Sequence, residues 1–191
     1  MTWRSMNDPT PPALGLIELS SVARGFETTD RMLKVAEVEL VLARTICSGK
    51  YMVMVAGQLE EVEASVAGGR EIAAECAIDH FVIANVHPAV FPALSSSGPM
   101  PKREALGIIE SFSVASLVEA IDRVAKTALV EMVECRLAMA LGGKAYLVFT
   151  GDVDAVKYAI AAGVAVVEER GLLVNQVVIP DPRPELFDAL L

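Results

Sequence analysis

Aromatic residues, cysteine and positive charge are all scarce in this chain of 191 residues. Aromatic side chains make up 5% of the sequence, and the single tryptophan is Trp3. Because 53% of the residues are nevertheless hydrophobic, the core must be built from Val, Ala, Ile, Leu and Met. The three cysteines are an odd number without close spacing, which favours a reducing compartment over a disulfide framework.

Acidic residues outnumber basic ones, and long apolar runs are missing. The formal net charge of −9 argues against binding to nucleic acid or to an anionic membrane surface, both of which need clustered positive charge. No apolar run reaches the roughly 20 residues that a membrane-spanning helix needs. Residues 1–12 lack the apolar segment of a signal peptide. We therefore expect an acidic cytoplasmic protein whose partners include neither nucleic acid nor membrane.

The sequence contains an internal repeat. Residues 13–18, ALGLIE, return as residues 105–110, ALGIIE, and twelve of the twenty-two positions of 13–34 are identical in 105–126. The matches continue with Gly-Lys at 49–50 and 143–144, and with Val-Ile at 82–83 and 178–179. A repeat this long indicates a duplicated domain rather than a solenoid. With a loop signal at 95–101, SSSGPMP, we expect a tail at 1–12 and domains at 13–98 and 99–191.

Each copy is expected to contain the same elements in the same order. The first copy predicts a strand at 13–19, a helix at 22–36, a hairpin of strands at 38–46 and 50–56, a helix at 59–76, a strand at 80–86 and a short helix at 88–94. The second copy repeats this order and ends with a helix at 152–170 closed by Gly171, a strand at 172–179 and a helix at 184–191. The fold class is therefore α+β, with two tandem ferredoxin-like β-α-β-β-α-β domains.

Common catalytic signatures are absent from the sequence. The phosphate-binding motif GxxxxGK[ST] needs a glycine six residues before its lysine. That position holds Arg44 before Lys50 and Ala138 before Lys144, so neither Gly-Lys belongs to such a loop. Neither GxSxG nor HExxH occurs, and His80 and His87 are interpreted as surface or packing residues. Without an acid–base pair or an activated nucleophile, an enzyme is the least favoured class.

The cysteines differ in their expected surroundings. Cys76 falls on the apolar stripe of its helix and Cys135 on the inward face of its strand, so both are expected to be inert core thiols. Cys47 lies at a hairpin tip within residues 45–50, whereas the second copy's tip at 139–143 is two residues longer and carries no sulfur. If three chains met with Cys47 at a threefold axis, the converging thiolates would need a cation or cluster to neutralise them.

The paired ALGxIE strands, the DRxxK helices, the Gly-Lys tips and the Val-Ile terminal strands resemble the shell proteins of bacterial microcompartments. The resemblance covers residues 13–191 and is to the tandem-domain trimeric type. It implies two tandem shell domains, a pseudohexameric homotrimer that tiles shell facets beside other shell proteins, and a central pore. The implied pore-loop residues are Ile46, Ser48, Gly49, Leu141, Gly142 and Gly143.

The first tip is similar to pore loops of this family in which one cysteine from each of three subunits holds a 4Fe-4S cluster. The resemblance thus implies Cys47 as the metal ligand, one 4Fe-4S cluster per trimer, and electron transfer or cluster delivery across the shell, with lumenal redox enzymes as further partners. Two other classes stay open: a shell tile with a cluster-free pore for small polar metabolites, and a regulatory ligand-binding module, since ferredoxin-like duplications also build such modules.

The resemblance also implies contacts at the edge of the tile. Lys34 and Lys126 match the lysine that family members place there. The family's edge arginine is replaced by Asn85 in the first copy and by Asp181 in the second, where Arg183 lies two positions further along. Lys34, Lys126 and Arg183 are therefore the expected edge residues.

Overall fold

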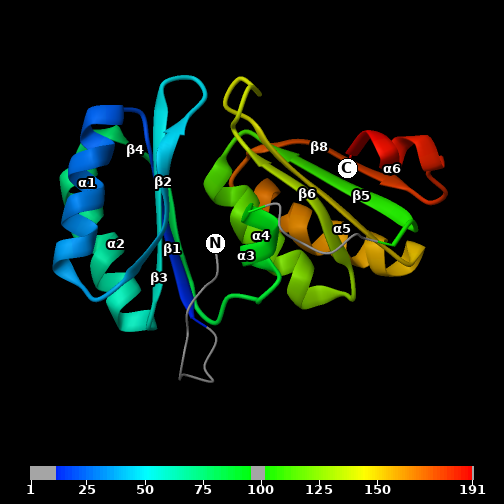
Figure 1. The fold of residues 1–191 in the computed structure, drawn as a ribbon, viewed down its shortest axis with the longest axis horizontal. Coiled ribbons are helices and arrows are strands. Elements are labelled where there is room, and N and C mark those ends of the chain that lie inside the picture. Colours follow the sequence, from blue (N-terminus) through cyan, green and yellow to red (C-terminus); the bar gives the residue numbers. More distant parts are fainter. Residues whose placement is uncertain (1–11, 96–101, 191) are drawn as a thin grey trace. The chain divides into compact units, whose positions relative to one another are not determined.

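Two four-stranded sheets, one from each copy of the repeat, organise the part of the chain that the structure describes (Figure 1). The structure is a computed structural model and describes residues 12–95 and 102–190. The expected tail at 1–12 and the expected domain boundary between 98 and 99 lie essentially outside these residues. The first copy contains β1 (Ala13–Leu19), α1 (Val22–Val35), β2 (Glu39–Ile46), β3 (Lys50–Gly57), α2 (Leu59–Ala73), the 3-10 turn η1 (Ala74–Cys76), β4 (Ala77–Ile83) and α3 (Val90–Ser95). The second contains β5 (Ala105–Ser111), α4 (Val114–Thr127), β6 (Glu131–Leu137), β7 (Ala145–Gly151), α5 (Val153–Glu169), β8 (Leu173–Ile179) and α6 (Pro184–Leu190).

Both sheets have the same topology, which confirms the expected tandem α+β fold. The strand orders are β2-β3-β1-β4 and β6-β7-β5-β8, with every neighbouring pair antiparallel. The register is also duplicated, because Ile17 lies opposite Val53 and Ile109 lies opposite Leu147. The repeat seen in the sequence is therefore a repeat of strand pairing as well.

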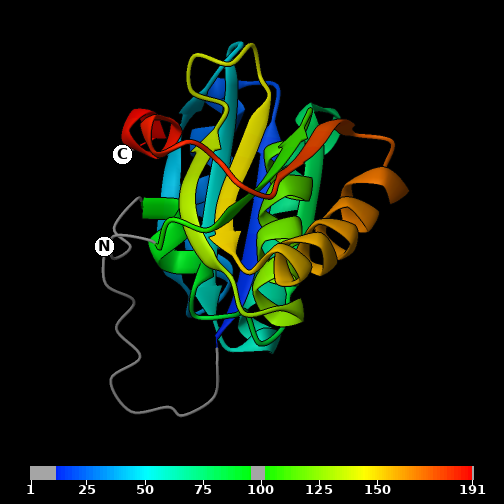
Figure 2. The same ribbon diagram turned by 90° about the vertical axis from the view of Figure 1, so that its right-hand side faces the viewer.

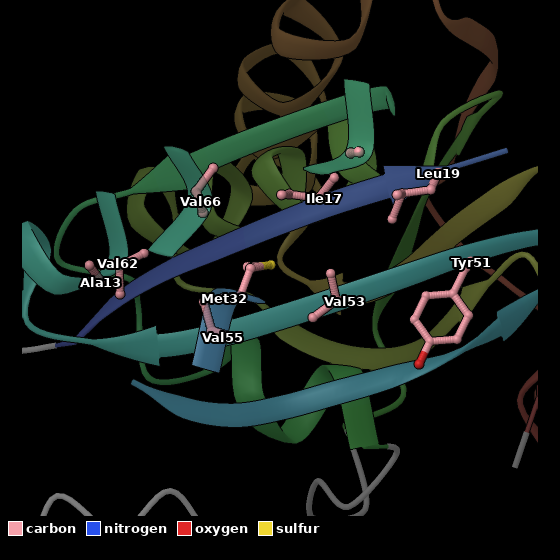
Figure 3. Packing of buried hydrophobic residues seen from close by; sticks show 10 residues of the cluster. Ala13, Ile17, Leu19, Met32, Tyr51, Val53, Val55, Val62 and Val66 are labelled. Carbon is pink, nitrogen blue, oxygen red and sulfur yellow. The ribbon is translucent and has the colours of Figure 1, made fainter. Parts of the chain in front are cut away.

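The repeated glycine of the ALGxIE motif is explained by close packing of a helix on the central strand. A Cβ atom on Gly15 would lie 2.6 Å from Val66 Cγ2 and 2.7 Å from Val62 Cγ1, both on α2. At the matching Gly107 of β5, the nearest atom is Phe149 Cζ on the neighbouring strand β7, at 2.6 Å, and Val156 Cγ1 of α5 lies 3.0 Å away. Figure 3 shows the resulting core of the first sheet, where aliphatic side chains of adjacent strands pack together with those of the helices.

Serine caps begin the first helix of each copy. The Ser21 hydroxyl accepts the main-chain N–H of Arg24 at 3.3 Å, and the Ser113 hydroxyl accepts that of Ser116 at 3.2 Å. At the other end of the second copy, α5 stops before Gly171, whose φ of +67° is the left-handed conformation that glycine adopts readily. The predicted helix end at Gly171 is thus confirmed.

The second helix of the first copy ends earlier than the sequence predicts, and the following strand starts earlier. We expected a helix through residue 76 and a strand at 80–86, but α2 ends at Ala73 and β4 spans Ala77–Ile83. Ala74 takes a φ of +46°, which breaks the helix. The Cys76 carbonyl then accepts the main-chain N–H of Ser20 at 2.8 Å, so the chain pairs beside β1 at once.

The chain divides into two compact units, residues 1–86 and 87–191. The short helix α3, which belongs to the first sequence copy, lies in the second unit and packs against α4 and β6 (Figure 1). Figure 2 shows α4 and α5 along one face of the second sheet and α6 on the other. There Phe187 of α6 is buried against Leu106 and Val148. No helix in the described ranges has the length and apolarity to cross a membrane.

Candidate functional site

Cys47 lies at the tip of the β2–β3 hairpin, where the sequence places it. Ile46 pairs with Lys50, so Cys47, Ser48 and Gly49 form the turn between the strands. Gly49 has a φ of +77°, a conformation that a residue with a side chain seldom adopts. Cys47 is half-buried and is not in a disulfide, while Ile46 turns inward and is buried. The tip therefore presents a thiol together with the exposed main chain of Ser48 and Gly49.

A buried ion pair anchors the tip to the centre of the sheet. Lys50 Nζ lies 2.9 Å from Oε1 of Glu18, a β1 residue with no exposed side-chain surface. The second copy repeats the pair between Lys144 and Glu110, at 2.5 Å and with more exposure of both side chains. The Gly-Lys of each tip thus has a structural role, because its lysine neutralises a carboxylate inside the sheet.

The tip of the second copy is the longer one, as predicted. Its strand ladder ends at the pair Leu137 and Ala145, which leaves residues 138–144 as the loop. Gly142 is exposed and Leu141 half-buried, while Gly143 is buried, and Lys144 donates its main-chain N–H to the Leu141 carbonyl at 3.2 Å. Left-handed φ values shape this loop at Ala138, Ala140, Gly142 and Gly143. The two tips therefore differ in length, backbone and chemistry.

A metal centre cannot be completed within one chain from the described residues. Among them, no group of three or more His, Cys, Asp or Glu side chains is placed to hold a metal ion. Cys135 is buried on β6, as expected for a core thiol. Cys76 is half-buried in the η1 turn rather than on a helix stripe, so the expectation of a core position was wrong for this residue. Any metal or cluster bound by Cys47 would need ligands from other chains.

The expected edge residues lie on helices α1 and α4 and just before α6, and each is in an ion pair. Lys34 Nζ lies 2.6 Å from Asp30 Oδ2, and Lys126 Nζ lies 2.6 Å from Asp122 Oδ2. Arg183 is exposed and pairs with Glu185 at 3.2 Å. The copies thus share an Asp–Lys pair one helical turn apart.

Sequence reasoning missed the second contact of Asp122. Its Oδ1 accepts the main-chain N–H of His87 at 2.7 Å, just before α3. The imidazole Nδ1 of His87 in turn accepts the N–H of Ala89 at 3.2 Å, which confirms a packing role for this histidine. The duplicated DRxxK motif was visible in the sequence, but its link to a segment 35 residues away was not.

A polar network on the second sheet was also missed. The Tyr146 hydroxyl donates to Glu134 Oε2 at 2.9 Å, and Arg136 Nε donates to Glu134 Oε1 at 2.7 Å. Burial and the hydrogen bond to Glu134 raise the pKa of Tyr146 to about 12. Alternation on β6 and β7 places these residues on the sheet face opposite Cys135.

Both copies of the repeat are similar to known proteins. The BMC domain model matches residues 13–86 and 105–182. The chain is 39% identical over 175 residues to the bacterial microcompartment shell protein PduT of Citrobacter freundii, which covers 92% of this chain and 95% of that protein. It is 40% identical over 83 residues to the shell protein EutM of Escherichia coli K12, covering 44% of this chain and 84% of that protein.

Two solved structures share the fold. A microcompartment protein from Desulfitobacterium hafniense DCB superposes with a TM-score of 0.84 at 47% identity, covering 92% of this chain and 97% of that one. A fused permuted hexameric shell protein of the RMM microcompartment superposes with a TM-score of 0.64 at 20% identity, over 83% and 84% of the two chains, which shows likeness of fold alone.

Proposed function

Because the chain belongs to the BMC-domain family of bacterial microcompartment shell proteins, we propose that three copies form one shell tile with a 4Fe-4S cluster held by their Cys47 thiolates. The chain is a structural shell protein of the PduT type and not an enzyme. It forms part of a microcompartment shell in the cytoplasm. The family likewise favours a shell tile over the regulatory module considered above.

The observation that carries the cluster proposal is the position of Cys47. Its thiol lies at a hairpin tip, outside any disulfide, and its own chain offers no neighbouring ligand set within the described residues. Because one chain supplies only part of a ligand set, Cys47 fits a site that three chains share. The soft thiolate is the ligand type that iron–sulfur clusters take from proteins. Three cysteines leave one iron of the cluster without a protein ligand.

The residues around Cys47 suit a fixed ligand. The Glu18–Lys50 pair ties the base of the tip to β1, and the left-handed Gly49 closes the turn in one conformation. The main-chain N–H groups of Ser48 and Gly49 are the nearest donors along the chain for hydrogen bonds to sulfur, which tune reduction potential. When bound, the cluster supplies one-electron transfer, which at a pore connects the two sides of the shell.

The tile itself is proposed as a pseudohexameric homotrimer beside other shell proteins. In it, Ile46, Ser48, Gly49, Leu141, Gly142 and Gly143 form the pore loops, and Lys34, Lys126 and Arg183 lie at the edge. The two unlike tips would then alternate around the pore. Lumenal redox enzymes are proposed as the partners that exchange electrons with the cluster.

The test is iron and acid-labile sulfide per chain after anaerobic purification. We expect about four irons for every three chains in the wild type, with loss of both iron and sulfide in Cys47→Ala, which has no atom that can ligate iron. Cys76→Ala is the matched control, since it removes a half-buried thiol from the η1 turn, and it should keep the iron. Reversible reduction of the loaded protein would support electron transfer.

A wild type without iron, even after anaerobic reconstitution, would contradict the cluster. If its trimers persisted, the tile would then carry a cluster-free pore for small polar metabolites. Iron retained in Cys47→Ala would overturn the assignment of the ligand.

A further inference from the structure

Each copy of the repeat has an arginine at the same place on the strand that leads to the hairpin tip. Arg44 of β2 and Arg136 of β6 are counterparts in the sequence, and each lies opposite a counterpart on the next strand, Met52 or Tyr146. The two arginines therefore occupy one register position in two sheets. Their surroundings differ, and the difference concerns the copy that carries Cys47.

In the second copy the arginine is paired. Arg136 Nε donates to Glu134 Oε1 at 2.7 Å, and the Tyr146 hydroxyl donates to the other oxygen of that carboxylate at 2.9 Å. Glu134 lies two residues before Arg136 on the same strand, so both side chains are on one face of the sheet. The net charge of this pair is zero.

In the first copy the arginine has no such partner. Leu42 takes the place of Glu134, and Met52 takes the place of Tyr146. Arg44 is half-buried, its Nε is buried without a hydrogen-bond partner, and no ion pair among the described residues includes it. The first copy thus keeps the positive charge and lacks the carboxylate that balances it in the second.

The other cation at the base of the tip is balanced. Lys50 pairs with Ile46 in the last rung of the hairpin, and its ammonium group lies 2.9 Å from the buried Glu18 carboxylate. Met52 lies opposite both Glu18 and Arg44, so it separates this ion pair from the guanidinium. Arg44 is therefore the cation of the β2–β3 tip that keeps its net charge.

The next carboxylate along this row is too far away to pair with Arg44. Asp79 of β4 lies opposite Glu18, three strands from Arg44 in the sheet order β2-β3-β1-β4. Three strand spacings amount to about 14 Å, well beyond the reach of an ion pair.

Arg44 is also close to the proposed cluster ligand. It lies three positions before Cys47, which is about 10 Å or less even along an extended strand. A half-buried charge at this range is only partly screened by salt. In the proposed tile, one arginine from each chain places three such charges around one cluster.

We propose that Arg44 sets the reduction potential of the cluster held by Cys47, through an uncompensated positive charge beside it. Reduction transfers one electron from the redox partner proposed above, and the reduced cluster carries one more negative charge than the oxidised one. Positive charge nearby therefore favours the reduced form and raises the potential. The inference rests on the proposed cluster and goes beyond it by naming the residue that tunes it.

The experiment is a potentiometric titration of the anaerobically loaded full chain, with dithionite as the reductant and the visible absorbance as the readout. Arg44→Met removes the charge and should lower the midpoint potential. At the wild-type midpoint, the ratio of reduced to oxidised cluster should fall by about tenfold or more, because three charges are lost per cluster. Arg44→Lys keeps the charge and should stay close to the wild type. An equal fall in both variants would assign the effect to structure and overturn the proposal.

Leu42→Glu tests the charge without removing the arginine. It supplies a carboxylate at the position that Glu134 occupies in the second copy, so it should lower the potential in the same direction as Arg44→Met. Glu134→Gln with Arg136→Met is the matched control, because it removes both charges of the paired copy and leaves the net charge unchanged. Its potential should equal that of the wild type. A wild-type potential in Arg44→Met or in Leu42→Glu would overturn the proposal.

Iron content separates this inference from the cluster itself. All of these variants keep Cys47, so each should bind as much iron per chain as the wild type. A wild type without iron would contradict the cluster and this inference together. Iron-loaded variants that share one potential would contradict this inference alone.

Discussion

At the scale of single residues, the two copies carry the same ion pair in different surroundings. Glu18 is fully buried against Lys50, whereas Glu110 and Lys144 are both partly exposed. Removing one partner of a buried pair leaves a charge in a medium that solvates it poorly. We expect Lys50→Met to lower the free energy of unfolding by about 3–5 kcal/mol. Lys144→Met should cost about 1 kcal/mol or less. Urea unfolding of both variants measures the difference.

The double variant Glu18→Leu with Lys50→Met is the control for this prediction. It removes both charges, so it should recover most of the stability lost in Lys50→Met. Equal losses in Lys50→Met and Lys144→Met would show that burial does not set the energy of these pairs.

The glycine of the first ALGxIE motif is a second residue whose effect can be measured. Gly15→Ala places a methyl group within 2.7 Å of two valines of α2, so the helix must move from the sheet. Overpacking of this kind costs about 1–3 kcal/mol. Gly57→Ala is the control, because its Cβ would have ordinary contacts of 3.5 Å or more. Thermal unfolding should separate the two, and similar midpoints would contradict the packing argument.

At the scale of elements, the β6–β7 pair contains a group that titrates late. The pKa of Tyr146 is raised to about 12, so the folded chain keeps the phenol proton after the unfolded chain has begun to lose it. Its contribution to stability is therefore complete below about pH 10 and is lost as the pH rises toward 12. Tyr146→Phe should flatten this fall in stability, measured by urea unfolding across the range. An unchanged slope would assign the fall to other groups.

The ends of elements show what the sequence could and could not predict. Glycine readily adopts left-handed backbone, so Gly171 predicted the end of α5, and this prediction was confirmed. In the first copy Ala74 takes the positive φ that ends α2, but an alanine in the sequence does not indicate a helix end. The apolar periodicity ran on through Cys76, so the helix was predicted too long and the strand three residues too late.

The candidate site also has one part that the sequence predicted and one part that it did not. The hairpin with Cys47 at its tip was predictable, because two apolar runs flank a short turn with glycine. The docking of α3 on the second unit was not, since no local period encodes a contact between His87 and Asp122. Long-range contacts of this kind depend on packing, which composition and spacing do not specify.

At the scale of the whole molecule, the proposed tile edge makes a prediction about assembly. Lys34 and Lys126 each pair with the aspartate one turn earlier on the same helix, and we proposed above that their ammonium groups contact the neighbouring tile. Lys34→Ala with Lys126→Ala should leave trimers intact and reduce the formation of flat sheets seen by negative-stain electron microscopy. Lys157→Ala, from an exposed pair on α5, is the control. Normal sheets from the double variant would remove these lysines from the edge.

The unequal hairpin tips have a consequence for how such an assembly can change. In a ring of identical single domains, one substitution appears at every position around the axis. A chain with two covalently joined copies breaks that constraint, since the short tip with Cys47 and the long tip at 138–144 are encoded separately. One tip is free to acquire a reactive group while the other adjusts the width of the opening. In the proposed tile, duplication would therefore give the pore two linings that can change independently.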